Sequence, residues 1–268
     1  MFRATGGNGK HSPAMAHLFL NRARLFHPTR GPGVHEAHFR WETFNAVLYN
    51  LGTVLFVLGS VSLFPRLAPY AGLGGWIFLC GSMLYLVVNA HDTVEVVRAR
   101  RAGMAATLQA DLELVAALTY LGGTCLFVAG RVALFAGPAW ATLGALGFVI
   151  GSLLFVVGAC INVLQIVQAR SLAALQLMNL TAVAFVVGSV LFAVGSVPYL
   201  WHLEAERDRA LLDGFLAWQW LAGSALFLVG GLFNFWRAAL VSREEMAACG
   251  NGRAADLPAR PLPARAGS

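Results

Sequence analysis

The sequence predicts an all-α, polytopic integral membrane protein with six transmembrane helices, arranged as three parallel helical hairpins. Three observations predict this fold class. The chain of 268 residues is 58% hydrophobic and only 12% charged, whereas about a quarter of the residues in soluble domains are charged. Six apolar stretches reach about the 20 residues that a helix needs to cross a bilayer. A five-residue block, Gly-[Ser/Thr]-x-Leu-[Phe/Tyr], recurs once in each stretch.

The apolar stretches set the order of elements along the chain. Short connections separate them, and short connections favour antiparallel neighbours. The predicted hairpins are therefore 43–91, 112–165 and 174–240, with a cytoplasmic loop at 92–111 between the first two. The stretches cover roughly Thr43–Phe64, Ala71–Ala90, Leu112–Phe135, Ala139–Val163, Leu175–Val197 and Gly214–Trp236.

An arm and a tail flank the hairpins. In the N-terminal arm, residues 1–42, the segment Pro13–Phe26 places apolar side chains toward one side of a helix, beside Arg22 and Arg24. Two alternatives fit this pattern: an interfacial helix on the cytoplasmic leaflet, or a solvated arm. The tail, residues 241–268, is polar and rich in Pro and Arg, which is typical of a disordered segment.

The net charge of +6 indicates membrane topology rather than nucleic-acid binding. With six spans, both termini lie on one side, together with the loops after the second and fourth helices. That side holds all but four of the 19 Lys and Arg residues, and cytoplasmic loops collect such residues. We therefore expect cytoplasmic termini and a plasma (cell inner) membrane location. The expected partners are the lipid bilayer and anionic lipid head groups at the basic face, and the sequence identifies no protein partner.

The repeated block forms a stripe along each helix. Positions i, i+3, i+4 and i+7 share a helix face, where the block places two glycines and an aromatic side chain. In lipid no hydrophobic effect drives helices together, so close backbone contact must do so. We interpret the stripe as a packing device, in which a glycine notch accepts a phenylalanine from a neighbouring helix. In the odd-numbered stretches its residues are Gly52, Phe56, Gly59, Gly123, Phe127, Gly130, Gly188, Phe192 and Gly195.

Continuing the stripe to position i+11 reaches a polar residue in three of the stretches, and we call these residues the polar level. This position holds Asp92, Asn162 and Asn234 in the second, fourth and sixth stretches. All three are expected at one depth, near the cytoplasmic end. They form either a polar ring around a pseudo-threefold axis that admits or binds a solute or ion, or a set of helix-end polar residues at the membrane interface.

Two residues depart from the repeat. Val88 stands where the other five helices carry Gly, and Arg131 stands where the matching helices carry Ser60 and Ser196. Arg131 is a candidate buried charge near the outer end of its helix. It either snorkels to the lipid head groups or pairs with a carboxylate of an outer loop.

Motifs for catalysis and for metal binding are missing from the sequence. It has no Gly-x-Ser-x-Gly elbow and no Walker loop, and His35 and His38 do not form the HExxH zinc pattern. We therefore expect no catalytic, cofactor-binding or metal-binding site, and no enzyme activity.

The first two stretches are similar to a known module. The segments NLGTVLFVLGSVSLF and GGWIFLCGSMLYLVVNA, preceded by FRWETFN, resemble the YrhK-like domain, a two-helix membrane module with paired Gly-Ser-x-x-Phe signatures. The likeness is best over 39–90, weaker over 112–163 and weakest over 175–236. It implies the hairpin architecture and brings no activity or functional residues with it.

Two hypotheses about function follow from these patterns. The leading one is a structural or interaction role in the membrane, without enzyme activity. The alternative is a small-solute or ion channel or transporter that uses the level of Asp92, Asn162 and Asn234. Parallel hairpins differ from the inverted repeats of many transporters, which favours the first hypothesis.

Overall fold

The part of the protein that the structure describes is helical apart from one small pair of strands and short turns. The computed structural model describes residues 14–16, 23–25, 32–101, 108–165, 171–201 and 206–255. The strands are β1 (Ala14–Ala16) and β2 (Ala23–Leu25), and the three 3-10 helices are η1 (Pro65–Tyr70), η2 (Pro138–Trp140) and η3 (Val197–Leu200). The α-helices are α1 (Pro32–Val61), α2 (Ala71–Arg101), α3 (Leu108–Phe135), α4 (Ala141–Leu164), α5 (Leu172–Ser196) and α6 (Glu206–Ala255).

Six helices are long and apolar enough to cross a membrane, which confirms the six apolar stretches. The shortest span has 19 residues, close to the required length of about 20. Large apolar side chains cover the outside of the bundle: Leu58 is 51% exposed, Trp76 58% and Trp218 62%. A soluble protein rarely leaves apolar surface of this extent in water, so the outer surface suits lipid.

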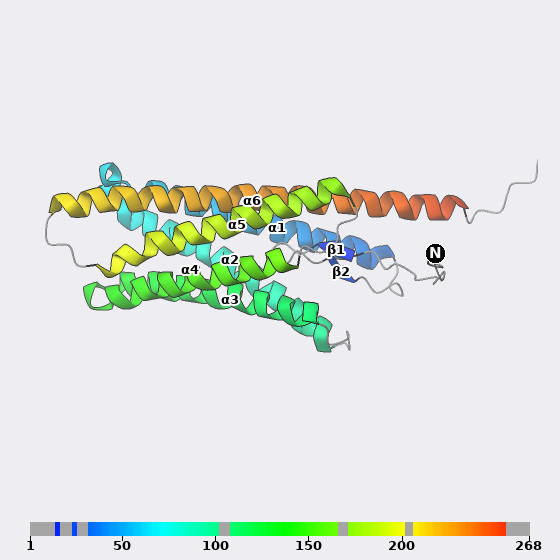
Figure 1. Ribbon diagram of the computed structural model, residues 1–268, viewed down its shortest axis with the longest axis horizontal. Coiled ribbons are helices and arrows are strands. Elements are labelled where there is room, and N and C mark those ends of the chain that lie inside the picture. The colour runs from blue at the N-terminus through cyan, green and yellow to red at the C-terminus, as the bar shows by residue number, and fades with distance from the viewer. Residues whose placement is uncertain are drawn as a thin grey trace, which may run out of the picture.

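The six α-helices form a closed ring. Each packs against the helices before and after it in the chain, and α6 also packs against α1. Figure 1 shows the elongated bundle, with the C-terminal part of α6 extending past the other helices. We call the three couples α1–α2, α3–α4 and α5–α6 the helix pairs. The end of the bundle with η1, η2 and η3 is the turn end, and the opposite end, where β1 and β2 lie in Figure 1, is the terminal end.

Proline and glycine shape the turn end. Pro65, Pro138 and Pro198 each lie at the first or second position of a 3-10 helix. Proline suits such a position because its φ is already near the helical value and the missing N–H has no helical partner there. Gly137 precedes η2 with a φ of 115°, which side chains other than hydrogen disfavour. These residues reverse the chain over short connections.

At the terminal end the helices are longer than the apolar stretches. α1 begins at Pro32, inside the predicted arm, and α2 continues to Arg101, so much of the predicted loop at 92–111 is helical. Arg100 Nη1 lies 2.8 Å from Asp111 Oδ1 and ties the end of α2 to the start of α3. The polar parts of these helices have no apolar signal, so hydropathy alone does not find them.

The C-terminal helix differs from its prediction as well. α6 continues to Ala255, into the segment 241–268 for which we predicted disorder. Residues 241–255 include four Ala, two Glu and two Arg, which favour helix. The Pro- and Arg-rich composition behind the prediction begins only at Asp256, outside the described residues.

The N-terminal arm contains strands where a helix was one alternative. β1 and β2 pair antiparallel, with Ala14 opposite Leu25 and Ala16 opposite Ala23. The idea of one interfacial helix over Pro13–Phe26 is therefore wrong for these residues. A helix of that length is marginal by itself, whereas the strand pair gains support because β1 packs against α6.

Candidate functional site

The glycines of the repeat hold aromatic rings of the paired helix. In α1–α2 a Cβ atom on Gly52 would lie 2.9 Å from Tyr85 Cδ2, and one on Gly81 would lie 2.9 Å from Phe56 Cε1. The exchange is reciprocal, since each helix offers one glycine and one ring at corresponding places. Only a residue without a side chain leaves room for this approach, and the ring fills the space with dispersion contacts.

The same exchange occurs in the other two helix pairs. In α3–α4 a Cβ on Gly123 would lie 2.7 Å from Phe155 Cδ2, and Gly151 faces Phe127. In α5–α6 Gly188 faces Phe227 and Gly223 faces Phe192. In each pair the glycine that begins the block of one helix meets the ring that ends the block of its partner, because the two helices run antiparallel.

A second aromatic position, which the sequence analysis missed, lies three residues before each block. The signal was present in the sequence, but it falls outside the block that we aligned. Its rings fill the later glycine notches: Gly59 faces Phe78, and Gly195 faces Trp220. Gly130 is different, since a Cβ there would meet the carbonyl oxygen of Gly144 at 2.8 Å. The residues at this position are Tyr49, Phe78, Tyr120, Phe148, Phe185 and Trp220.

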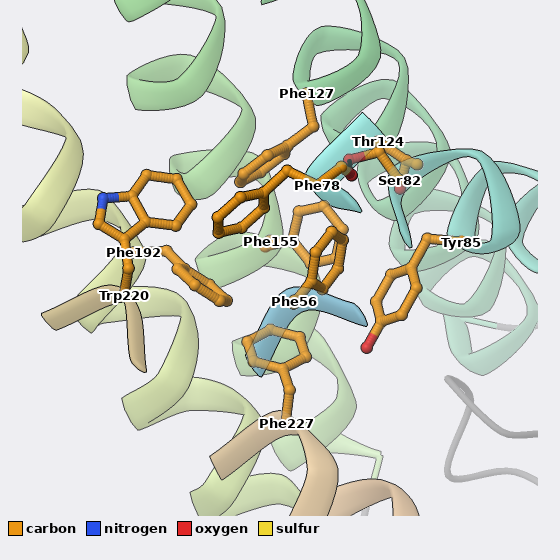
Figure 2. Close-up of a pocket in the computed structure, with 10 residues that line it drawn as sticks. All are labelled: Phe56, Phe78, Ser82, Tyr85, Thr124, Phe127, Phe155, Phe192, Trp220 and Phe227. Carbon is orange, nitrogen blue, oxygen red and sulfur yellow. Dashed lines mark hydrogen bonds between the residues drawn. The ribbon is translucent and has the colours of Figure 1, made fainter. Parts of the chain in front are cut away.

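Twelve aromatic side chains, two from each helix, therefore fill the centre of the ring of helices. All are buried, and all belong to one continuous cluster. Figure 2 shows rings from all six helices converging on one place. Ring contacts link the helix pairs, as between Phe127 and Phe192, whose centroids lie 6.3 Å apart, and between Phe155 and Phe227 at 6.0 Å. The space left among these rings measures only about 20 Å³.

Val88 changes the contacts of one ring. It is fully buried and stands where a glycine would otherwise receive Tyr49. Tyr49 instead stacks on Tyr85, with centroids 4.7 Å apart, and donates its hydroxyl to the carbonyl oxygen of Phe227 at 3.3 Å. A Cβ on Gly231 of α6 would clash with the Tyr49 ring. The departure at position 88 thus couples α1 to α6.

Two of the block hydroxyls, those of Thr124 and Ser224, lie between helix pairs. Thr124 donates to the carbonyl oxygen of Tyr120 in its own helix at 2.8 Å and accepts from Asn89 Nδ2 of α2, also at 2.8 Å. On the other side of the bundle, Ser60 Oγ of α1 and Ser224 Oγ of α6 lie 3.2 Å apart. These hydrogen bonds join neighbouring helix pairs within the apolar part of the bundle.

The three residues of the predicted polar level are buried. Asp92 is 3% exposed, Asn162 4% and Asn234 2%. Asn162 Nδ2 donates to the hydroxyl of Tyr120 at 3.0 Å, across the α3–α4 pair. Asp92 Oδ1 lies 3.8 Å from His91 Nδ1 on the same helix. A shared ring around an axis stays a prediction.

Two more buried charges lie toward the terminal end. Glu113 of α3 is 5% exposed and Arg237 of α6 is 2% exposed. We counted Arg237 only as part of the topology signal and did not single out Glu113. Continuing the stripe three residues beyond Asn234 reaches Arg237, so the repeat itself held the signal for this residue. The terminal end is therefore a polar, charged layer beneath the aromatic core.

His91, Asp92 and Glu95 of α2 are the one group of potential metal ligands in the part of the chain where side chains are described. Their ligand atoms lie within 4.8 Å of one another. His91 Nδ1 is already 2.8 Å from the amide of Asn45, and all three residues come from a little more than one helical turn. The group fits an ion-pair cluster better than a built metal site.

Arg131 reaches from α3 over aromatic rings near the turn end. Its Cζ lies 5.3 Å from the centroid of Phe78, 5.5 Å from that of Phe148 and 5.9 Å from that of Phe135. Its Nε is buried without a hydrogen-bond partner among the described residues. The predicted carboxylate partner is not found among these residues either, since their ion pairs do not include Arg131.

Comparison with known proteins adds a family resemblance to this geometry. The YrhK-like protein family matches residues 39–97 and 110–167. These ranges contain the reciprocal glycine–ring contacts of α1–α2 and α3–α4, and the match does not extend to α5–α6. No curated protein and no solved structure matches the chain. The α5–α6 pair nevertheless repeats the same contacts, which indicates a third copy of the arrangement with a more divergent sequence.

Proposed function

Because this chain carries two tandem YrhK-like segments, we propose that it is a multi-pass integral membrane protein with a structural or interaction role and no enzyme activity. Its six apolar helices cross the bilayer as three parallel hairpins, and both termini lie in the cytoplasm. The strong excess of Lys and Arg on the side of the termini supports this orientation. The plasma membrane is the proposed location.

One observation carries the proposal: the centre of the helix ring is filled. The space among the central rings is about 20 Å³, which admits a single water molecule and no larger solute. A solute path along the axis would need several layers of buried rings to move apart. A filled core instead makes a rigid body that can present its cytoplasmic segments to partners.

The lining of the central space also argues against chemistry there. Its described lining residues are aromatic, apart from the hydroxyls of Ser82 and Thr124. Ser82 donates to the carbonyl oxygen of Phe78 at 2.9 Å, and Thr124 is bonded as described above. An intramembrane enzyme needs ionisable groups that face a hydrated cavity, and this place supplies neither the groups nor the room.

A channel or transporter that uses Asp92, Asn162 and Asn234 is the competing function. Cytoplasmic water can reach polar residues at the terminal end without any pore, so labelling from that side does not distinguish a channel from a structural protein. Accessibility from the turn end is decisive, because a reagent must then pass the aromatic core.

The test uses single cysteines at positions 92, 162 and 234 in a background without Cys80, Cys125, Cys160 and Cys249. The protein is reconstituted in vesicles, and a charged, membrane-impermeant thiol reagent is added only on the turn-end side. We expect no labelling at the three positions and full labelling of an exposed turn-end control, G72C. Labelling of any of the three from that side would establish a path through the bundle and contradict the proposal.

A further inference from the structure

Arg131 of α3 departs from the repeat, in which the matching positions of α1 and α5 hold a serine. The matching position holds Ser60 in α1 and Ser196 in α5, and both serines donate to a carbonyl oxygen of their own helix, at 2.7 Å and 2.6 Å. These small side chains are fully buried and satisfied. In α3 a long cation stands at the same place. Packing of the repeat therefore does not explain Arg131.

A cavity of about 170 Å³ lies beside this arginine. Its lining includes Phe78, Phe148 and Trp220, which belong to the central cluster, and Tyr199 from η3. Lining residues also come from the turn after α1 and from α3 and α4, so the cavity lies inside the ring of helices at the turn end. Because about 10–15 Å³ of such space holds one water molecule, the cavity has room for several waters or for a small organic molecule.

The cavity combines one cation with apolar walls. The described lining residues include no carboxylate, and Leu63, Leu134, Ala141 and Ala145 complete the walls. Rings cover the faces of the guanidinium group at 5.3 to 5.9 Å, and cation–π contacts of this kind stabilise a cation without satisfying its N–H groups. These in-plane donors match the oxygens of a carboxylate or phosphate.

We propose that this cavity binds an oxyanion, a carboxylate or phosphate group carried by a compact and partly apolar molecule. Arg131 binds the oxyanion, and the Tyr199 hydroxyl supplies a second donor. Leu63, Leu134 and the two alanines accept the apolar part. Tyr199 is 42% exposed, which leaves the cavity open toward the turn end. Either a soluble anion or the head group of an anionic lipid can supply this chemistry.

Binding is measured on the full-length protein in nanodiscs of zwitterionic phosphatidylcholine. One arm titrates inorganic phosphate and hexanoate by calorimetry. The other arm compares nanodiscs with and without phosphatidylglycerol and counts retained lipid by native mass spectrometry. Saturable binding in the first arm identifies a soluble anion, and retention in the second identifies a lipid head group.

The variants separate the site from general charge effects. Arg131→Ser restores the residue that the repeat carries in α1 and α5, so it should fold, and it is expected to weaken binding at least tenfold. Tyr199→Phe should weaken it a few-fold. Arg66→Gln removes an exposed charge at the same end of the bundle and should leave binding unchanged.

Three outcomes would overturn the proposal. They are unchanged binding in Arg131→Ser, equal loss in Arg66→Gln, and no binding by the wild-type protein in either arm. The proposal does not depend on the scaffold role, because a bundle that conducted ions could hold the same site. Failure of anion binding leaves the scaffold role standing. Labelling of positions 92, 162 or 234 from the turn-end side would contradict the scaffold role and leave the anion site standing.

Discussion

At the scale of single residues, a glycine and a ring are the repeated unit of this molecule. Gly123 of α3 and Phe155 of α4 show it in close contact, because a Cβ on the glycine would come within 2.7 Å of the ring and within 2.9 Å of the carbonyl oxygen of Gly151. The second contact is with backbone, which cannot rotate away as a flexible side chain can. Substitution here must push the two helices apart.

The first prediction compares two glycines with opposite surroundings. Gly123→Ala should lower the free energy of unfolding by about 1–3 kcal/mol, the usual range for overpacking a filled core. Gly72→Ala is the matched control, since a Cβ there meets nothing within 4 Å. The measurement is reversible unfolding of the full-length protein in mixed micelles. Equal stability of the two variants would contradict the packing role of the glycine.

Part of this residue pattern was predictable, and part was not. The shared face of Gly52, Phe56 and Gly59 follows from helix periodicity alone. The ring that enters each notch comes from another helix, so its identity depended on knowing the pairing. The surroundings of Arg131 come from three helices and a turn. The periodicity of one helix therefore could not predict which groups Arg131 contacts.

At the scale of elements, the helix pairs are joined by hydroxyl and amide hydrogen bonds. Asn89 of α2 and Thr124 of α3 are both 1% exposed, and they connect the two YrhK-like segments. Because Thr124 uses its one proton toward the carbonyl oxygen of Tyr120, it must act as the acceptor for Asn89.

The second prediction measures this connection by a double-mutant cycle. Asn89→Ala and Thr124→Ala, alone and combined, should give a coupling energy of about 0.6 kcal/mol and at most about 1.7 kcal/mol, the range found for hydrogen bonds between membrane helices. Asn89→Ala paired with Ser196→Ala serves as the uncoupled control, because Ser196 bonds within α5. A coupling of zero for the first pair would show that the bond does not stabilise the contact.

The third prediction concerns the turn between α3 and α4. Gly137→Ala should destabilise the protein by about 1–3 kcal/mol, because a φ of 115° is strained for alanine. No atom lies within 4 Å of the position a Cβ would take, so any loss reflects backbone strain and not a clash. Unfolding compared with Gly72→Ala provides the measurement, and an unchanged stability would contradict the left-handed backbone at this residue.

Element boundaries were harder to predict than element identity. The apolar spans follow from the roughly 20 residues that a bilayer requires. The polar extensions at Pro32, Arg101 and Ala255 depend on helix propensity and on contacts outside the membrane region. The pairing of β1 with β2 depends in addition on the surface of α6, which no local pattern in the arm reveals.

At the scale of the whole molecule, the contact of α1 with α6 closes the ring. Ser60 Oγ and Ser224 Oγ lie 3.2 Å apart although 164 residues separate them in the chain. The three helix pairs repeat the same glycine–ring contacts, and Arg131 and Val88 depart from that repeat.

The fourth prediction tests this closure. In a background without native cysteines, S60C with S224C should form an intramolecular disulfide, because the two side chains already approach within bonding range. S62C with S224C is the control, since Ser62 bonds to Leu58 on its own helix and lies on an exposed part of the surface. Mobility on non-reducing gels reports the product. Equal cross-linking of both pairs, or none of the first, would contradict the closed ring.

The central claim is that the rings leave no path for solutes through the middle of the bundle. Ser82 lines the central space and is 2% exposed, so S82C places a thiol there with little change in size. In vesicles, a charged thiol reagent supplied on both sides should leave S82C unlabelled while it labels the exposed control G72C to completion. Labelling of S82C at a rate close to that of G72C, in folded protein, would contradict the account.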